Sequence, residues 1–223
     1  MPSIFRQTVA ASLGLLALAT TGLGAAETGG AEASSGSSDL AVLLQPTAAS
    51  RPRRDQHGER PTPESLRDRL VVVSFVSVGC TIVCAVRTLD LDKLARALPE
   101  PLRGRVSFLA LDTDPTGDDA RDEAGRLRRF AEGLVGPTTP LRFLDADAAA
   151  TAAIADRLRY PARALPEPPQ TILVFDRRGQ IAMTYGSDPL DAPRLRRDLA
   201  ILDTFENGVG RPPRGTSEPA PTH

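Results

Sequence analysis

A nine-residue stretch at residues 70–78 constrains the fold of this chain more than any other feature of its sequence. The stretch reads LVVVSFVSV, which is almost continuously apolar and rich in β-branched side chains. Such a run predicts a strand that is buried on both faces of its sheet. A strand of this kind needs other strands beside it and helices on both faces, so the stretch favours an α/β domain.

The residues after this stretch predict helices and strands in alternation. An amphipathic helix is expected after Cys80 and before Pro99, because proline interrupts helical hydrogen bonding. Its apolar side is predicted to carry Val83, Val86, Leu89 or Leu91, Leu94 and Leu98. Further strands are predicted at residues 105–112, 141–144, 171–176 and 180–185, and further helices at residues 118–133, 147–158 and 193–205. The last two strands flank an Arg-Arg-Gly hairpin turn, and the pattern as a whole predicts a central mixed sheet flanked by helices.

The two ends of the chain differ in composition from its middle. Residues 1–26 have the pattern of an export signal or an uncleaved N-terminal anchor, with one arginine, a short apolar run and a Gly-Ala-Ala cleavage site. Residues 27–49 are predicted to be a flexible linker, residues 50–206 the folded domain, and residues 207–223 a disordered tail. We therefore expect an exported protein of the periplasm, either released or anchored to the inner membrane, where disulfides form.

The overall charge excludes one class of partner. The chain has a formal net charge of −1 and an isoelectric point near 6.2. Proteins that bind nucleic acids normally carry a basic excess, so no nucleic-acid partner is expected. A membrane contact is expected only through the N-terminal anchor. The chain holds two cysteines and two histidines, so any metal site built from them would have almost no spare ligands.

The two cysteines, Cys80 and Cys84, are placed where they can carry chemistry. They lie four residues apart at the predicted start of a helix, so both sulfurs can point to the same side. A helix start favours the thiolate of Cys80, and two thiolates can bind Cu(I) or zinc or exchange with a disulfide. A purely structural disulfide is the alternative. A loop this short would contribute about 2 kcal/mol of stability on the chain-entropy model.

Several motifs together resemble the Sco/SenC family of exported thioredoxin-fold proteins. The resemblance covers residues 50–206 and rests first on the CxxxC motif directly after the core strand. Supporting segments are Asp-Gln-His-Gly at residues 55–58, Ser-Leu-Arg-Asp at 65–68, Asp-Pro-Thr-Gly-Asp at 114–118 and Phe-Leu at 143–144. The resemblance implies a thioredoxin-like fold with an N-terminal hairpin. It also implies copper binding and thiol chemistry in cytochrome c oxidase assembly, with an oxidase subunit or another thiol- or copper-bearing protein as partner.

The chain departs from the family pattern at its predicted site. Thr81 and Ala85 replace the prolines that follow the two cysteines in the family. The position of the family's copper-binding histidine corresponds to Pro168, and no histidine lies near it in the sequence. Thioredoxin folds place a cis-proline before this strand, and Pro168 or Pro169 is the candidate for it here. This replacement favours thiol–disulfide chemistry and leaves copper binding open.

No other residue of the chain is a strong candidate for a third copper ligand. His57, His223 and Met183 are expected to be solvated or packing residues. Four aspartates could suggest a hard-cation site, but they lack the spacing of a calcium-binding loop and are expected at strand ends and helix caps: Asp112, Asp114, Asp118 and Asp119. Three hypotheses therefore stay open. The chain is a dithiol–disulfide reductase with Cys80 as the attacking and Cys84 as the resolving sulfur, a Cu(I) chaperone with the same two sulfurs as ligands, or a binding domain with a structural disulfide.

Overall fold

The computed structural model describes residues 38–44, 53–77, 82–114, 123–145, 147–159, 170–186 and 189–209. The predicted export signal and most of the predicted linker and tail lie outside these residues. Among the helices that are described, none is long and apolar enough to cross a membrane.

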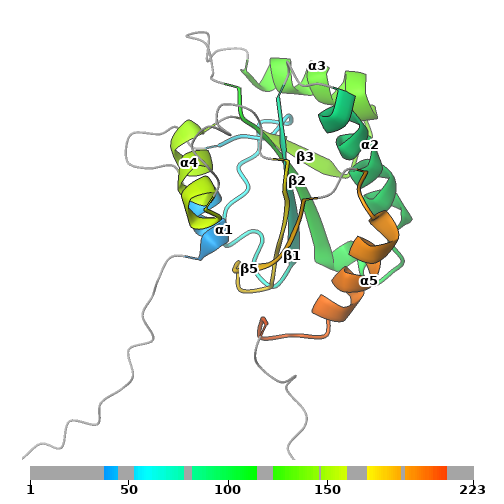
Figure 1. The fold of residues 1–223 in the computed structure, drawn as a ribbon. Helices are drawn as coiled ribbons and strands as arrows, with labels where there is room; N and C mark the ends of the chain where they lie inside the picture. Colours follow the sequence, from blue (N-terminus) through cyan, green and yellow to red (C-terminus); the bar gives the residue numbers. More distant parts are fainter. Residues whose placement is uncertain are drawn as a thin grey trace, which may run out of the picture. The chain divides into compact units, whose positions relative to one another are not determined.

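A five-stranded mixed sheet forms the centre of the fold (Figure 1). Its strands are β1 (Leu70–Val76), β2 (Val106–Asp112), β3 (Leu141–Leu144), β4 (Ile172–Phe175) and β5 (Ile181–Tyr185), in the order β3-β2-β1-β4-β5. Strands β1, β2 and β3 are parallel, β4 is antiparallel to β1, and β5 is antiparallel to β4. The predicted α/β class and mixed sheet are confirmed, and β1 has the central position that its composition predicts.

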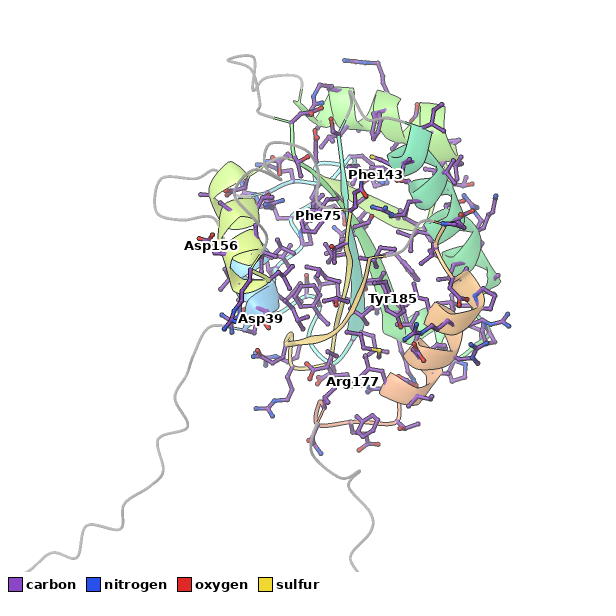
Figure 2. All side chains as sticks on the ribbon, viewed as in Figure 1. Asp39, Phe75, Phe143, Asp156, Arg177 and Tyr185 are labelled. Atoms are coloured by element: carbon purple, nitrogen blue, oxygen red, sulfur yellow. The ribbon has the colours of Figure 1, made fainter. Side chains whose placement is uncertain are left out.

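Helices cover both faces of this sheet. One face packs against α2 (Ile82–Ala97), α3 (Glu123–Val135) and α5 (Ala192–Leu202), and the other against α1 (Asp39–Leu44) and α4 (Ala148–Arg157), as Figure 1 shows. All seven residues of β1 are buried, and its side chains alternate between the two hydrophobic clusters. Phe75 and Phe143 are enclosed between these layers (Figure 2). The continuous apolar run of β1 is therefore explained by helices on both sides.

Helix α2 turns a different side to the sheet than its aliphatic pattern predicts. Val83 and Val86 are 40% and 43% exposed, whereas Thr88 is only 1% exposed. Leu94, in the second half of the helix, is buried as predicted. Cys84 belongs to the buried cluster, and Thr88 and Leu91, one and two turns further on, share its side of the helix. The prediction for the first half is therefore wrong, because the side of this half that packs on the sheet carries Cys84 and Thr88 in place of Val83 and Val86.

The six residues of α1 correct the prediction that residues 27–49 form a flexible linker. Leu43 is fully buried, and α1 packs against α4. The Asp39 carboxylate pairs with Arg157 Nε at 2.5 Å, and Leu40 N donates to Gly179 O at 2.9 Å. The linker prediction is wrong for these residues because a short apolar run without visible periodicity covers a sheet face that would otherwise be open to water.

Two further predictions need correction at the edges of the domain. The turn predicted at residues 55–58 is present, with Asp55 accepting hydrogen bonds from the backbone of His57 and Glu59. Its extended contact is an isolated antiparallel bridge from Asp55 to Leu144, so in the part described it docks on β3 instead of forming the paired strands of a hairpin. In the predicted tail, Val209 N donates to the Asp176 carboxylate at 3.1 Å, so the prediction of disorder is wrong for residues 207–209.

Candidate functional site

The candidate site lies where β1 ends and α2 begins. Cys84 is the third residue of α2, 9% exposed and disulfide-bonded. The other cysteine of the chain, Cys80, falls within residues 78–81 and so lies outside the described part. Thr88 Oγ1 donates to the backbone oxygen of Cys84 at 2.9 Å, in a buried hydrogen bond one helical turn further on. Cys84 is therefore held firmly on the inner side of α2.

The end of β1 is held by hydrogen bonds from the end of β2. Val76 O accepts from Thr113 N at 2.9 Å and from Thr113 Oγ1 at 3.1 Å. One residue further, Ser77 Oγ donates to Asp114 Oδ1 at 2.5 Å. Ser77 is the last described residue before Cys80, so these contacts fix the point from which the cysteine segment starts.

Two carboxylates and one guanidinium form a cluster beside this point. Asp112, the last residue of β2, is 1% exposed and forms an ion pair with Arg126 of α3. Arg126 also lies 3.9 Å from Asp114, and Asp114 N donates to Asp112 Oδ1 at 3.0 Å. Burial raises the pKa of Asp112, and the opposing hydrogen bonds from Asp114 N and Arg126 do not cancel this effect. Hydrogen bonds and ion pairs therefore hold these three side chains in place at the carboxyl ends of β1 and β2.

The outer side of the first turn of α2 is apolar and exposed. Ile82 is 82% exposed, and Val83 and Val86 are each more than a third exposed. The first turn carries no acidic side chain. An exposed aliphatic surface of Ile82, Val83 and Val86 therefore borders the disulfide-bonded Cys84.

The structure brings no third copper ligand to Cys84 within its described part. His57 is exposed and follows Gln56, whose backbone nitrogen donates to Phe143 O at the outer edge of β3. Strands lie about 4.8 Å apart, so β2 and β3 place this segment roughly 14 Å from β1. Among the described residues, no group of three or more His, Cys, Asp or Glu side chains could hold a metal ion. Of the two predicted sulfur ligands, the described part of the chain therefore places Cys84, which is disulfide-bonded.

The other predicted candidates take packing or outlying positions. Met183 packs against the core cluster, which is the packing role predicted for it. Pro168, Pro169, Asp118, Asp119 and His223 lie outside the described residues. Thr171 is buried directly before β4, which runs antiparallel to β1 and so begins at the end where β1 stops.

Sequence reasoning missed Ser77 and Arg126 as parts of this site. Ser77 interrupts an apolar run three residues before Cys80, and that interruption was the available signal. Arg126 is one of many arginines in the chain, and nothing in its sequence neighbourhood distinguishes it. Both residues acquire their roles only when β1, β2 and α3 are brought together.

Comparison with known proteins gives a clear result for structure only. No protein-family model and no curated protein matches the sequence. Among solved structures, a SCO1/SenC family lipoprotein from Bacillus anthracis matches with a TM-score of 0.54 and 20% identity, covering 67% of this chain and 90% of that one. Bradyrhizobium japonicum ScoI with copper bound matches with a TM-score of 0.51 and 20% identity, covering 67% and 95%. BsSco, a member of the Sco family of cytochrome c oxidase assembly proteins in which a disulfide switch was identified, matches with a TM-score of 0.51 and 17% identity, covering 69% and 91%.

All three likenesses cover about two thirds of this chain and nine tenths or more of the matched structures. At such low identity these likenesses show the fold alone, and the chemistry has to be argued from the residues of this chain. The chain has the thioredoxin-like α/β fold of these Sco/SenC structures.

Proposed function

We propose that this chain is a Sco/SenC-like protein that acts by thiol–disulfide exchange through Cys80 and Cys84. The observation that carries the proposal is the disulfide-bonded Cys84 in the first turn of the helix after the central strand. It has this position in a fold shared with BsSco, the Sco protein in which a disulfide switch was identified.

The exchange needs only the two cysteines and a partner protein that carries a disulfide. In the dithiol form, the Cys80 thiolate attacks a partner disulfide, forms a mixed disulfide and releases one partner thiolate. The Cys84 thiolate then attacks the Cys80 sulfur, which closes the intramolecular disulfide and releases the second partner thiolate. Two electrons and two protons pass to the partner, and a dithiol of lower reduction potential restores the starting form by the reverse steps.

A structural disulfide explains this arrangement less well. The end of β1 is already fixed by Thr113 and by the hydrogen bond between Ser77 and Asp114. A crosslink that closes so short a loop contributes only about 2 kcal/mol. The exposed side chains of Ile82 and Val83 also give a partner access to the start of α2. Reactivity therefore accounts for the pair better than crosslinking does.

Copper handling is the second candidate function, with Cu(I) as cargo. It is favoured by the shared fold of Bradyrhizobium japonicum ScoI, which was solved with copper bound. The thiolates of reduced Cys80 and Cys84 are soft donors that suit Cu(I). Pro168 has no donor atom in its side chain, so this chain would hold Cu(I) with two protein ligands and more weakly than with an added imidazole.

The cellular setting follows from the N-terminal pattern and the family resemblance. The chain would act after export, in the periplasm, either free or held at the inner membrane by residues 1–26. Its partner would be a protein with reactive cysteines or a copper site, such as a cytochrome c oxidase subunit during assembly.

A redox titration tests the principal proposal. The chain is equilibrated with mixtures of reduced and oxidised glutathione, and the dithiol fraction is counted by alkylation and mass spectrometry. We expect reversible exchange with a reduction potential above about −300 mV. A potential below that value, with a disulfide that resists glutathione, would show that the crosslink is structural. The Cys84→Ala variant is the control because it cannot close the intramolecular disulfide.

Competition with a chromophoric Cu(I) chelator tests the copper proposal. We expect the reduced chain to take up one Cu(I) and the Cys80→Ala, Cys84→Ala double variant to take up none. Equal binding by the two proteins would exclude copper handling through these sulfurs.

A further inference from the structure

We propose that Ser77 and Asp114 are positioning residues for the cysteine pair. Their hydrogen bond holds the end of β1 beside β2 and thereby helps to set the equilibrium between the dithiol and the disulfide. This inference rests on the proposed function, because it concerns the exchange reaction of Cys80 and Cys84.

The hydrogen bond is short and its acceptor is already fixed. Ser77 is 8% exposed, and its Oγ lies 2.5 Å from Asp114 Oδ1. Asp114 is held by its backbone contact to Asp112 and by Arg126, whose guanidinium is 3.9 Å away. Hydrogen bonds to a charged acceptor are stronger than those between neutral groups. The Ser77 hydroxyl therefore binds a carboxylate that is held by contacts from both β2 and α3.

The cysteine segment is short and runs between two fixed points. Four residues, 78–81, separate Ser77 from the first residue of α2. At the far end, Cys84 is held by its burial and by the Thr88 hydroxyl. Cys80 comes three residues after Ser77, so the freedom of its sulfur relative to Cys84 depends on how firmly each end is held.

The hydrogen bond between Ser77 and Asp114 is therefore expected to affect the redox chemistry of the cysteine pair. An intramolecular disulfide forms readily when the two thiols have a high effective concentration for each other. Releasing Ser77 from Asp114 lowers that concentration and makes the disulfide easier to reduce, while Val76 stays held by Thr113. Loss of the hydrogen bond is expected to shift the dithiol–disulfide equilibrium about tenfold toward the dithiol, which corresponds to about 30 mV.

The chain supplies a matched control on the same strand. Ser74 is 1% exposed, and its Oγ has no hydrogen-bond partner among the described residues. Ser74→Ala and Ser77→Ala therefore delete the same atom from buried positions of one strand segment, but only Ser77→Ala removes the contact to Asp114, which follows β2. Ser77→Thr retains the hydroxyl and is expected to restore the wild-type equilibrium within about threefold.

Variants of Asp114 separate position from charge. Asp114→Asn keeps an oxygen acceptor for Ser77 but removes the negative charge, whereas Asp114→Ala removes both. If the hydrogen bond acts by positioning, Asp114→Ala shifts the equilibrium as much as Ser77→Ala does, and Asp114→Asn shifts it less. An equal shift in the two Asp114 variants would assign the effect to charge and overturn the positioning role.

The experiment measures the glutathione equilibrium of the full chain and of each variant, with thermal unfolding to confirm that each is folded. The inference is supported if Ser77→Ala shifts the equilibrium about tenfold while Ser74→Ala stays within about twofold of wild type. It is overturned if the two serine variants agree, even though the wild-type pair exchanges. A wild-type pair that does not exchange at all would overturn the proposed function and this inference with it.

Discussion

The two ends of the central strand β1 are held by different kinds of contact. At its amino end, the turn between β4 and β5 binds both ends of the described chain, because Leu40 N donates to Gly179 O and Val209 N donates to the Asp176 carboxylate. At its carboxyl end, a hydroxyl-to-carboxylate contact from Ser77 precedes the cysteine segment. Beyond that segment the first turn of α2 presents exposed aliphatic side chains.

The amino end is a closed network of carboxylates and their donors. The Asp176 carboxylate accepts three backbone N–H groups, those of Arg178, Gln180 and Val209. Asp39 accepts from Ile181 N and pairs with Arg157. Figure 2 shows Asp39 and Arg177 toward this end, below Phe75. The buried carboxylates here accept hydrogen bonds from backbone N–H groups or pair with arginine, as buried polar groups in native proteins usually do.

This difference between the ends shows where the fold has room for function. Substitutions at the amino end are expected to lower stability, because the buried carboxylates of Asp39 and Asp176 hold backbone N–H groups from distant parts of the chain. Substitutions in the exposed first turn of α2, at the carboxyl end, are expected to change stability little. The predictions that follow test this contrast through the free energy of unfolding.

The largest loss of stability is expected when α1 loses its central contact. Leu43 is fully buried in the cluster that α1 and α4 form on the sheet. Leu43→Ala leaves a cavity, and we expect it to lower the free energy of unfolding by about 3 kcal/mol in urea denaturation. Val42 is only partly buried, so Val42→Ala serves as the control with an expected loss below about 1 kcal/mol. Unfolding of Leu43→Ala at the wild-type urea concentration would show that α1 does not belong to the fold.

A smaller loss is expected at the turn on which α1 begins. Gly179 and Gly58 both have positive φ, +73° and +81°, so alanine costs about 1 kcal/mol at either position. A Cβ at Gly179 would also lie 3.0 Å from Ser38 Oγ and 3.1 Å from Leu40 Cβ, whereas nothing lies within 4 Å at Gly58.

We therefore expect Gly179→Ala to cost about 2 kcal/mol and Gly58→Ala about 1 kcal/mol in thermal unfolding. The difference between the two variants measures how closely the start of α1 sits on the turn. Equal costs would mean that α1 is not seated there in solution.

The features that sequence predicted best depend on local signals. The strand at β1 follows from β-branching, and the β4–β5 hairpin follows from Gly179 after two arginines. The place of Cys84 at the start of a helix after the strand was also predictable, because the motif and the strand are adjacent. In each case neighbouring residues specify the structure without help from distant parts of the chain.

The features that sequence missed depend on distant contacts. Helix α1 is six residues long and owes its stability to packing on α4, so its own sequence could not reveal it. The hydrogen bond between Ser77 and Asp114 needs the parallel pairing of β1 with β2, which joins residues 37 positions apart. The rotation of α2 depends on its packing against the sheet, and aliphatic spacing alone predicted the wrong side for its first half.

The smallest effect on stability is expected at the exposed turn of α2. Ile82 is 82% exposed, so Ile82→Ser should change the free energy of unfolding by less than about 0.5 kcal/mol. Leu94 is 5% exposed on the same helix, and Leu94→Ala should cost about 3 kcal/mol as the matched control. Urea denaturation of both variants measures the contrast within one helix.

A loss above about 1 kcal/mol for Ile82→Ser would show that this side chain is covered in solution. The first half of α2 would then be rotated as its aliphatic spacing predicts, and the side carrying Val83 and Val86 would face the sheet. A loss near zero means that Ile82 stands near Cys84 without contributing to the fold. The apolar character of Ile82 would then have no structural cause. A partner that contacts the carboxyl end of β1 would explain it.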